Sequence, residues 1–319
     1  MRGLAVLALL GLAAQPAAAD RITLATWNLE WMMTPATFDA LAARCLQPGL
    51  RAGGRDRAIP CDLVSRARWS EQDLARLRSF AAALPLDVIA LQEVDGAQAA
   101  AAVFPDHAFC FTKRRHVQNV GFAIRRGIPH RCNRDYRALG LAGNDVRWGA
   151  DVTIFPGTPQ QVRLLGVHLK SACHRDPLTD PRPDCRVLQQ QVPVLEAWID
   201  ARAREGTAFA VLGDFNRRFD RERATARDAR NRIVALWPEI DDGEPAEADL
   251  HNAGADRGAV DCNNGEGARM PIDYLVLSRR LSQRMVPGSF RAWDYAGGGR
   301  WPDHCVISVE LQLETGNGL

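Results

Sequence analysis

Short apolar runs alternate along the chain with clusters of turn residues. The runs are rich in Val, Ile, Leu and Phe, which is typical of buried strands. The predicted strands span residues 22–27, 88–92, 108–112, 120–125, 152–155, 162–168, 208–212, 272–277 and 306–313.

Two other segments have the periodicity of amphipathic helices. Ser70 can cap the first, over residues 70–81, with Asp73 three residues further on. The second spans residues 186–204, with a kink predicted at Pro193. The positions expected to face the core are Leu74, Leu77, Phe80 and Ala81 in the first helix and Leu188, Val192, Leu195 and Ile199 in the second.

The order of these elements predicts an α+β fold. Many strands and few helices favour two packed sheets with helices outside. We expect one domain over residues 20–319, without repeats. Residues 33–69 and 172–184 are rich in Gly, Pro and Arg and contain a cysteine pair each, so we interpret them as surface insertions. Residues 217–260 are charged and read as loops with some helix.

Composition is that of a globular protein. The chain has 319 residues, of which 46% are hydrophobic and 24% charged, which excludes a disordered or fibrous protein. A formal charge of +2 argues against a polycationic coat for nucleic acid. Lys113 and Lys170 are the only lysines among 40 basic residues, so phosphate contacts would be made by forked guanidinium groups. A GC-rich genome would produce the same arginine bias.

The first 19 residues predict export. Arg2, an apolar run and the small residues Ala17-Ala18-Ala19 are typical of a secretory signal peptide cleaved before Asp20. A buried N-terminal helix is the alternative. The apolar run is too short to span a bilayer, and no other stretch is long enough, so we predict no transmembrane segment. We expect a periplasmic or secreted protein.

Eight cysteines suit an oxidising compartment. Eight cysteines allow 105 pairings, of which a sequential scheme is the simplest. A zinc site is the rival interpretation, but the chain has no C-x-x-C pair. The sequential scheme pairs Cys45 with Cys61, Cys110 with Cys132, Cys173 with Cys185, and Cys262 with Cys305.

Chemically capable side chains stand at the ends of the predicted strands. One such Asp or Asn is usually a turn former, and one His is usually an ordinary hydrogen-bonded residue. Carboxylates, amides and histidines at so many strand ends predict instead that they converge at one edge of a sandwich. The candidates are Asn28, Glu93, His168, Asp214, Asn216, Asp273, Asp303 and His304.

The motifs around these residues resemble those of the endonuclease/exonuclease/phosphatase superfamily. They are Thr26-Trp27-Asn28, Leu91-Gln92-Glu93, Val167-His168-Leu169-Lys170-Ser171, Gly213-Asp214-Phe215-Asn216, Ile272-Asp273-Tyr274 and Pro302-Asp303-His304. The superfamily includes DNase I, abasic-site endonucleases, sphingomyelinases and inositol-polyphosphate phosphatases. The resemblance covers residues 21–313 and implies a four-layer α/β/β/α sandwich (DNase I-like).

The resemblance also implies a metal-dependent phosphodiesterase. Asn28, Glu93 and Asp303 offer oxygen ligands suited to Mg²⁺ or Mn²⁺, which would neutralise a phosphate oxygen. Asn28 is also a substrate-binding candidate. Asp214 would orient or deprotonate the attacking water, and Asn216 would hold the phosphate.

Two histidines have implied catalytic roles. Asp273 would fix His304 and favour its charged form, which would bind developing negative charge. His168, in the HLKS form found on the DNase I and sphingomyelinase side, would help protonate the leaving oxygen. The glutamate that supports this histidine in DNase I has no counterpart between Lys113 and Val120.

Two further residues bear on the resemblance. Arg147 resembles the family's phosphate-contacting arginine, although it is also one of many surface arginines. Pro302 stands where the family usually has serine, which removes a hydroxyl and a backbone donor.

Three function hypotheses follow. The first is an exported metal-dependent nuclease with nucleic acid as its substrate. The second is a sphingomyelinase-like lipid phosphodiesterase or an inositol-phosphatase-like phosphatase, acting on phospholipid or a phosphorylated small molecule; a lipid enzyme would expose an apolar loop, for which residues 31–33 and Trp301 are candidates. The third is a catalytically silent binding protein. DNA or RNA preference, endo or exo cleavage, the number of metal ions and the oligomeric state stay open.

Arginines near the active edge would favour the nuclease hypothesis, because they could contact phosphates. The arginines expected there are Arg114, Arg115, Arg125, Arg126, Arg147 and Arg175.

Overall fold

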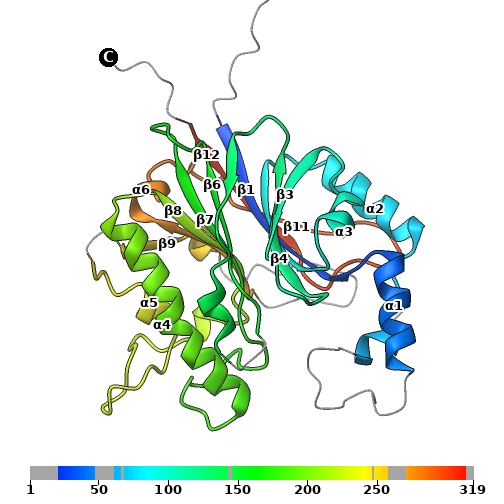
Figure 1. The fold of residues 1–319 in the computed structure, drawn as a ribbon. Helices are drawn as coiled ribbons and strands as arrows, with labels where there is room; N and C mark the ends of the chain where they lie inside the picture. Colours follow the sequence, from blue (N-terminus) through cyan, green and yellow to red (C-terminus); the bar gives the residue numbers. More distant parts are fainter. Residues whose placement is uncertain are drawn as a thin grey trace, which may run out of the picture.

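The chain folds into two sheets packed face to face, with helices on both outer faces (Figure 1). The computed structural model describes residues 21–46, 61–65, 68–142, 146–245, 248–257 and 271–313. The predicted signal peptide and Cys262 lie outside these residues. The α+β sandwich expected from the order of elements is therefore confirmed.

Each sheet has six strands and mixes parallel and antiparallel pairs. The first has the order β11 (Arg291–Trp293), β12 (Val306–Gln312), β1 (Arg21–Met32), β2 (Val88–Val94), β4 (Asn119–Arg125), β3 (His107–Phe111). The second has the order β5 (His130–Cys132), β6 (Ala150–Ile154), β7 (Val162–His168), β8 (Phe209–Asp214), β10 (Asp273–Ser278), β9 (Leu250–Asn252). The parallel pairs are β1 with β2 and β7 with β8.

The main core lies between the sheets. Because both faces of the central strands are covered, these strands are continuous apolar runs rather than alternating ones. In β1, Leu24 faces the partner sheet, while Ala25 and Trp27 face the helical layer on the other side. The outer face of the second sheet is covered in the same way by Leu188 and Val192.

The longest of the described helices are α1, α2 and α4, with 11, 12 and 22 residues. Ser70 and Asp73 form the expected capping box at the start of α2, and the predicted inward residues of α4 are fully buried. The α-helices are α1 (Pro35–Cys45), α2 (Glu71–Ala82), α3 (Ala97–Ala101), α4 (Pro183–Arg204), α5 (Trp237–Ile240) and α6 (Arg279–Ser282). The 3₁₀-helices are η1 (Cys61–Ser65), η2 (Arg137–Gly140), η3 (Phe219–Arg221) and η5 (Ala255–Arg257).

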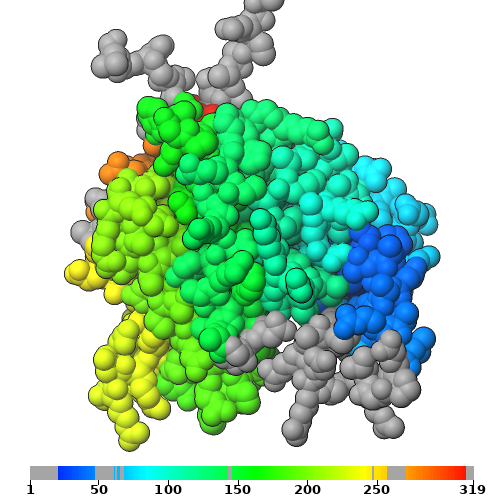
Figure 2. Space-filling model, viewed as in Figure 1, coloured from blue at the N-terminus to red at the C-terminus, as the bar shows by residue number. Residues whose placement is uncertain are grey.

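The predicted insertion at residues 33–69 is more regular than expected. It contains α1, which Thr34 caps through a 3.1 Å bond from the Thr37 N–H, followed by η1. In the space-filling view, α1 (blue) and the start of α4 (green) stand on either side of the lower edge of the molecule (Figure 2).

Three of the four expected disulfides are present. Cys45–Cys61 joins α1 to η1, Cys110–Cys132 joins an edge strand of each sheet, and Cys173–Cys185 closes the loop before α4. Cys305 is also disulfide-bonded, but its expected partner lies outside the described residues. Because no described cysteine is free, the zinc alternative has no support.

Candidate active site

Strand register brings three of the candidate side chains together. His168 at the end of β7 is paired with Asp214 at the end of β8. Asp273, the first residue of β10, is paired with Asp214 from the other side. Because paired strands lie about 4.8 Å apart, backbone hydrogen bonding alone sets three ionisable groups side by side.

Asp214 is the residue on which the site converges. Its Oδ2 lies 3.3 Å from Asn28 Nδ2, 3.4 Å from His168 Nε2 and 3.9 Å from His304 Nε2. The side chain is 2% exposed, and this burial, with the nearby charge of Asp273, raises its pKa to about 7. A carboxyl group of this kind can exchange a proton near neutral pH.

His304 and Asp273 form a dyad. His304 Nδ1 lies 2.6 Å from Asp273 Oδ2. Burial alone would lower the pKa of His304, but the charge and hydrogen bond of Asp273 and the charge of Asp214 raise it well above its ordinary value. These neighbours favour the charged imidazolium form of His304, whose Nε2 lies 3.9 Å from Asp214 Oδ2.

Glu93 lies next to this cluster on the other sheet. Its backbone has φ 59° and lies where the pairing of β2 with β4 shifts register. The side chain of Glu93 therefore projects from an irregular part of the strand. Glu93 Oε1 is 3.7 Å from His168 Nε2. Burial raises the pKa of Glu93, the charge of His304 lowers it and the neighbouring Asp303 raises it. Asp303 is 40% exposed, and its Oδ1 lies 3.9 Å from His304 Nε2.

The loop after β8 presents Asn216. Its N–H donates a 2.7 Å bond to Asp214 Oδ1 and its Nδ2 donates a 3.1 Å bond to the Leu169 carbonyl, so both residues are fixed. Gly213, with φ 145°, permits this turn, because an added Cβ would lie 2.1 Å from the Val167 carbonyl oxygen. No other residue type tolerates that approach without moving β8 from β7.

His168 is neutral. Burial and the charge of Arg147 hold its pKa well below the ordinary value. Its Nδ1 is buried without a hydrogen-bond partner, which agrees with the missing glutamate of the sequence motif. Of the residues at that position, Asn119 instead bonds the backbone oxygens of Asp95 and His116.

The arginines expected at the active edge divide into two groups. Arg147 donates to the carbonyl oxygens of His168 and Leu169, and burial lowers its pKa to about 10. The charge of Arg114 also reaches His168. Arg125 and Arg126 were wrongly expected here: β4 runs antiparallel to β2, so its last residue pairs with Asp87, at the opposite end of β2 from Glu93.

Three residues that the sequence did not single out support the site. The His174 Nδ1 donates a 2.9 Å bond to the Asn216 carbonyl. The Tyr295 hydroxyl accepts a 2.7 Å bond from Trp27 Nε1 and donates to the His304 carbonyl. Arg217, next to Asn216 in sequence, is buried although arginine is rarely so unless it is paired, and nothing in the sequence sets it apart from the other arginines.

Arg217 is the centre of a buried cluster. It is 1% exposed, pairs with Glu222, and donates 2.7 Å bonds to the Cys173 and Asp176 carbonyls. Glu222 in turn accepts from the backbone N–H groups of Leu236 and Trp237. The pair therefore joins the loop closed by Cys173–Cys185 to the loop that carries Asn216.

The side chains present fit a divalent cation. Asp214, Asp273 and His304 offer atoms within 4.8 Å of one another, but His304 is paired with Asp273, which favours its protonated form and makes it a poor ligand. The carboxyl groups of Glu93 and Asp214 both have pKa values raised by burial and by neighbouring carboxylates. A cation would relieve that repulsion, and Asp273 Oδ1 is buried without a partner.

Known proteins share this fold. No curated protein matches the chain in sequence. The Neisseria 3′ phosphatase NExo, bound to a product DNA hairpin, is 13% identical with a TM-score of 0.54, covering 91% of this chain and 99% of that one. The human nocturnin catalytic domain with bound sulfate is 13% identical with a TM-score of 0.54, covering 92% and 94%. TDP2 of D. rerio, complexed with a single-strand DNA product, is 16% identical with a TM-score of 0.51, covering 91% and 98%.

These structures establish the architecture, since their sequence identity is too low to carry more. The family model adds the sequence-level evidence. It matches residues 25–291, which include five of the six quoted motifs and most of both sheets. This chain therefore belongs to the endonuclease/exonuclease/phosphatase family.

Proposed function

We propose that this protein is an exported, divalent-metal-dependent phosphodiester hydrolase whose substrate is nucleic acid. One observation carries the proposal: buried Asp214 is surrounded by Asn28, His168 and the His304–Asp273 dyad, all from different strands or loops. Such a set can bind a phosphate, activate water and stabilise the charge that develops during hydrolysis.

Asp214 would accept the proton of the attacking water. A general base is most efficient when its pKa lies near the working pH, and burial places the pKa of Asp214 at about 7. Its geometry is fixed by the Asn216 N–H and the Asn28 amide. Asn216, which is fixed by the turn after β8, would bind the phosphate.

His304 would donate through Nε2 to a phosphate oxygen. Its Nδ1 is occupied by Asp273, which keeps the ring charged and correctly oriented. His168 would contribute a neutral N–H near Asp214 and Glu93, because its low pKa leaves no proton to release as an imidazolium at neutral pH. Arg147 would contact the phosphate from the same side.

Glu93 and Asp303, with Asn28, would hold the metal ion. Their oxygens are the ligands that Mg²⁺ and Mn²⁺ prefer. When bound, the ion would neutralise a phosphate oxygen and help the leaving group depart.

Nucleic acid is the substrate best supported. The Neisseria and D. rerio neighbours are described with DNA products, and Arg147 and Arg114 lie within electrostatic reach of His168. The lipid alternative has less support, because Met32 and Met33 are buried, Trp31 is only partly exposed, and Trp301 stacks on Tyr295 at 4.7 Å. Those residues do not form the exposed apolar loop that a lipid enzyme would need.

Disulfide bonds support export, whereas the predicted signal peptide lies outside the described residues. Three disulfides join described cysteines, and disulfides persist chiefly in oxidising compartments. Among the described helices, none has the length and apolar character needed to cross a bilayer.

The experiment compares substrates and a site variant. Wild-type protein and Asp214→Asn are incubated with plasmid DNA, single-stranded RNA and sphingomyelin vesicles, with Mg²⁺ or with EDTA. We expect metal-dependent cleavage of nucleic acid and at least about a 100-fold loss in the variant, as general-base removal typically gives. Glu205→Gln, a control at a carboxylate that is 51% exposed after the end of α4, should keep the wild-type rate. Sphingomyelin cleavage without nucleic-acid cleavage would refute the substrate, and an active Asp214→Asn would refute the role of Asp214.

A further inference from the structure

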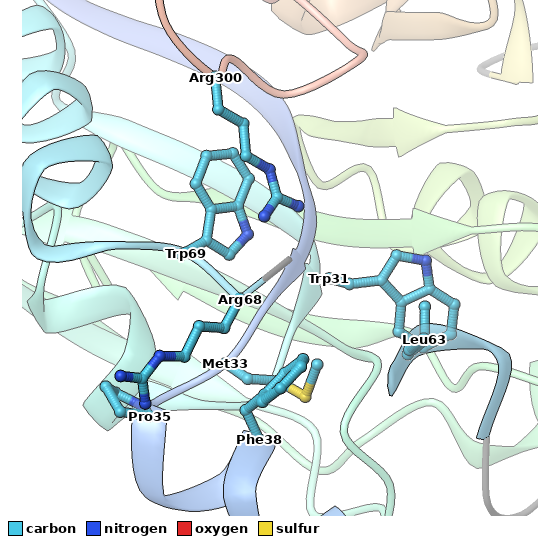
Figure 3. Close-up of a pocket in the computed structure, with 8 residues that line it drawn as sticks. All are labelled: Trp31, Met33, Pro35, Phe38, Leu63, Arg68, Trp69 and Arg300. Carbon is cyan, nitrogen blue, oxygen red and sulfur yellow. The ribbon is translucent and has the colours of Figure 1, made fainter. Parts of the chain in front are cut away.

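The hollow where β1 meets α1 is lined by Trp31, Leu63, Trp69 and Arg300 (Figure 3). The Arg300 guanidinium carbon lies 3.9 Å from the centre of the Trp69 ring and covers it, and Trp31 packs beside Leu63. The hollow has a volume of about 10 Å³, which holds at most about one water molecule. It therefore offers a nucleotide no room, and the substrate contacts proposed above lie instead at the edge formed by β6, β7 and β8.

One peptide group at this edge joins the two side chains proposed to hold the phosphate. It links Leu169 to Lys170, directly after β7. Its carbonyl oxygen accepts a 3.1 Å bond from Asn216 Nδ2 and a bond from Arg147 Nη2. Arg147 also donates through Nε to the His168 carbonyl, at 3.1 Å. The direction of the Leu169 carbonyl therefore helps to set where both side chains lie.

Gln191 of α4 holds the other side of the same peptide group. Its Oε1 accepts a 2.8 Å bond from the Lys170 N–H, and its Nε2 donates a 2.9 Å bond to the Leu139 carbonyl in η2. Gln191 is fully buried, so solvent does not compete for these bonds. Because a peptide group is planar, holding its N–H also fixes the direction of its C=O. Hydrogen bonds on both sides of one peptide group also strengthen each other by polarisation.

Strand pairing does not hold this peptide group. The ladder between β7 and β8 ends at the Leu169 N–H, which donates a 2.9 Å bond to the Asp214 carbonyl. That N–H belongs to the preceding peptide group. The group between Leu169 and Lys170 can rotate about the backbone bonds on either side of it, so its own N–H must be held to fix it. The Lys170 ammonium pairs with Asp184 of α4 at 2.6 Å, but a flexible lysine side chain does not set a peptide plane.

We propose that Gln191 is a positioning residue: by holding the peptide group between Leu169 and Lys170, it keeps Arg147 and Asn216 where they bind the substrate phosphate. The proposal rests on the proposed function, which gives Arg147 and Asn216 their phosphate-binding roles. The groups that act on the attacking water are held separately, by the pairing of β8 with β7 and β10. Loss of the Gln191 amide should therefore weaken substrate binding and leave the chemical step nearly unchanged.

Steady-state kinetics on a fluorescent oligonucleotide with Mg²⁺ separate binding from chemistry. Gln191→Met keeps the length of the side chain but removes both hydrogen bonds. It should raise KM about 10-fold, since misplaced donors lose their bonds to a charged phosphate, and change kcat by less than about twofold. Gln191→Glu keeps an oxygen that accepts from the Lys170 N–H, so its KM should stay within about threefold of the wild-type value.

Gln189→Met is the matched control. Gln189 lies on the same helix, and its Nε2 donates a 2.6 Å bond to the Ile233 carbonyl. This variant loses a bond of the same kind without touching the peptide group after β7, so it should change neither KM nor kcat. A KM for Gln191→Met no higher than that of the control would overturn the proposal. So would a fall in kcat without a rise in KM, or a Gln191→Glu variant as weak as Gln191→Met.

Amide hydrogen exchange followed by NMR tests the peptide group itself, whatever the substrate. The Lys170 N–H lies outside the strands, yet in the wild-type protein it should exchange as slowly as the N–H groups of β7. In Gln191→Met it should exchange at least about 10-fold faster. Rapid exchange of this N–H in the wild-type protein would overturn the proposal, and this measurement stands even if Gln191→Met does not fold.

Failure of the positioning role can be told apart from failure of the proposed function. If wild-type protein cleaves nucleic acid with Mg²⁺ but Gln191→Met leaves KM unchanged, the proposed function stands and the positioning role is wrong. If wild-type protein leaves nucleic acid intact while Gln191→Met speeds exchange of the Lys170 N–H, Gln191 does hold the peptide group and the catalytic proposal is wrong.

Discussion

The buried pair of Arg217 and Glu222 should contribute strongly to stability. Both side chains are 2% exposed. Arg217→Met removes the partner of a buried carboxylate and leaves the Cys173 and Asp176 carbonyls without their donor. Breaking a buried ion pair costs about 3–5 kcal/mol. Glu222 keeps two backbone N–H partners, so we expect the lower half of that range, about 3–4 kcal/mol.

Thermal unfolding followed by circular dichroism measures this cost. For chains of this size, 1 kcal/mol lowers Tm by about 2–4 °C, so Tm should fall by roughly 6–16 °C. Arg204→Met is the matched control: it breaks a 2.9 Å pair with Asp200, but Arg204 is 64% exposed, and such pairs contribute about 0–1 kcal/mol.

A double variant separates the ion pair from simple loss of packing. Arg217→Met combined with Glu222→Gln removes the uncompensated charge, so the double variant should be less destabilised than the sum of the two single variants. A Tm loss for Arg217→Met no greater than that of the Arg204→Met control would refute this reasoning. So would strict additivity in the double variant.

Three further predictions follow from contacts in the site. Gly213→Ala should cost about 2–4 kcal/mol and most of the activity, because its Cβ would meet the Val167 carbonyl; Gly157→Ala, with φ 77° and open space around it, should cost only about 1–2 kcal/mol by urea unfolding. Asp273→Asn should destabilise the metal-free protein. The raised pKa of His304 gives stabilisation that is complete below the unfolded value of about 6.5 and is lost as pH rises through the folded value. The Tm difference from wild type should therefore be larger at pH 6 than at high pH, and a pH-independent difference would count against the dyad. Tyr295→Phe should lower kcat without changing KM, since it frees the His304 carbonyl and Trp27 Nε1 while leaving the substrate-binding residues in place; an unchanged kcat would mean that Tyr295 does not position His304.

The strand-end residues could be predicted because their signal is local. An apolar run followed by a polar residue marks the C-terminal part of a strand and its edge of the sheet. Asp214 does end β8, whereas β1 continues past Asn28 to Met32 and β2 continues past Glu93 to Val94. Hydrogen bonding along whole strands sets the register that places His168 beside Asp214. Motifs that are distant in sequence therefore meet at one place. The error over Arg125 arose because sequence does not reveal strand direction in a mixed sheet.

Other features had no local signal. The edge strands β5, β9 and β11 have three residues each, too few for a periodicity to be recognised. The position of Tyr295 beneath His304 depends on packing against Trp27, far away in sequence. The left-handed conformations of Glu93 and Asn216 follow from tertiary constraints. Helix α1 did have a signal, since Thr34 and Pro35 are a typical cap and first residue, but the cysteines and glycines nearby favoured a loop.

The alignment of His168, Asp214 and Asp273 on three adjacent strands has a consequence for redesign. Their spacing is set by the ladder of backbone hydrogen bonds, so it does not depend on the length of the surface segments that adjoin these strands. Those segments could be exchanged for the corresponding segments of other family members to change substrate binding, while the three side chains stay in place. A graft that replaces the loop closed by Cys173–Cys185, which follows β7, would alter substrate selectivity before it altered chemistry.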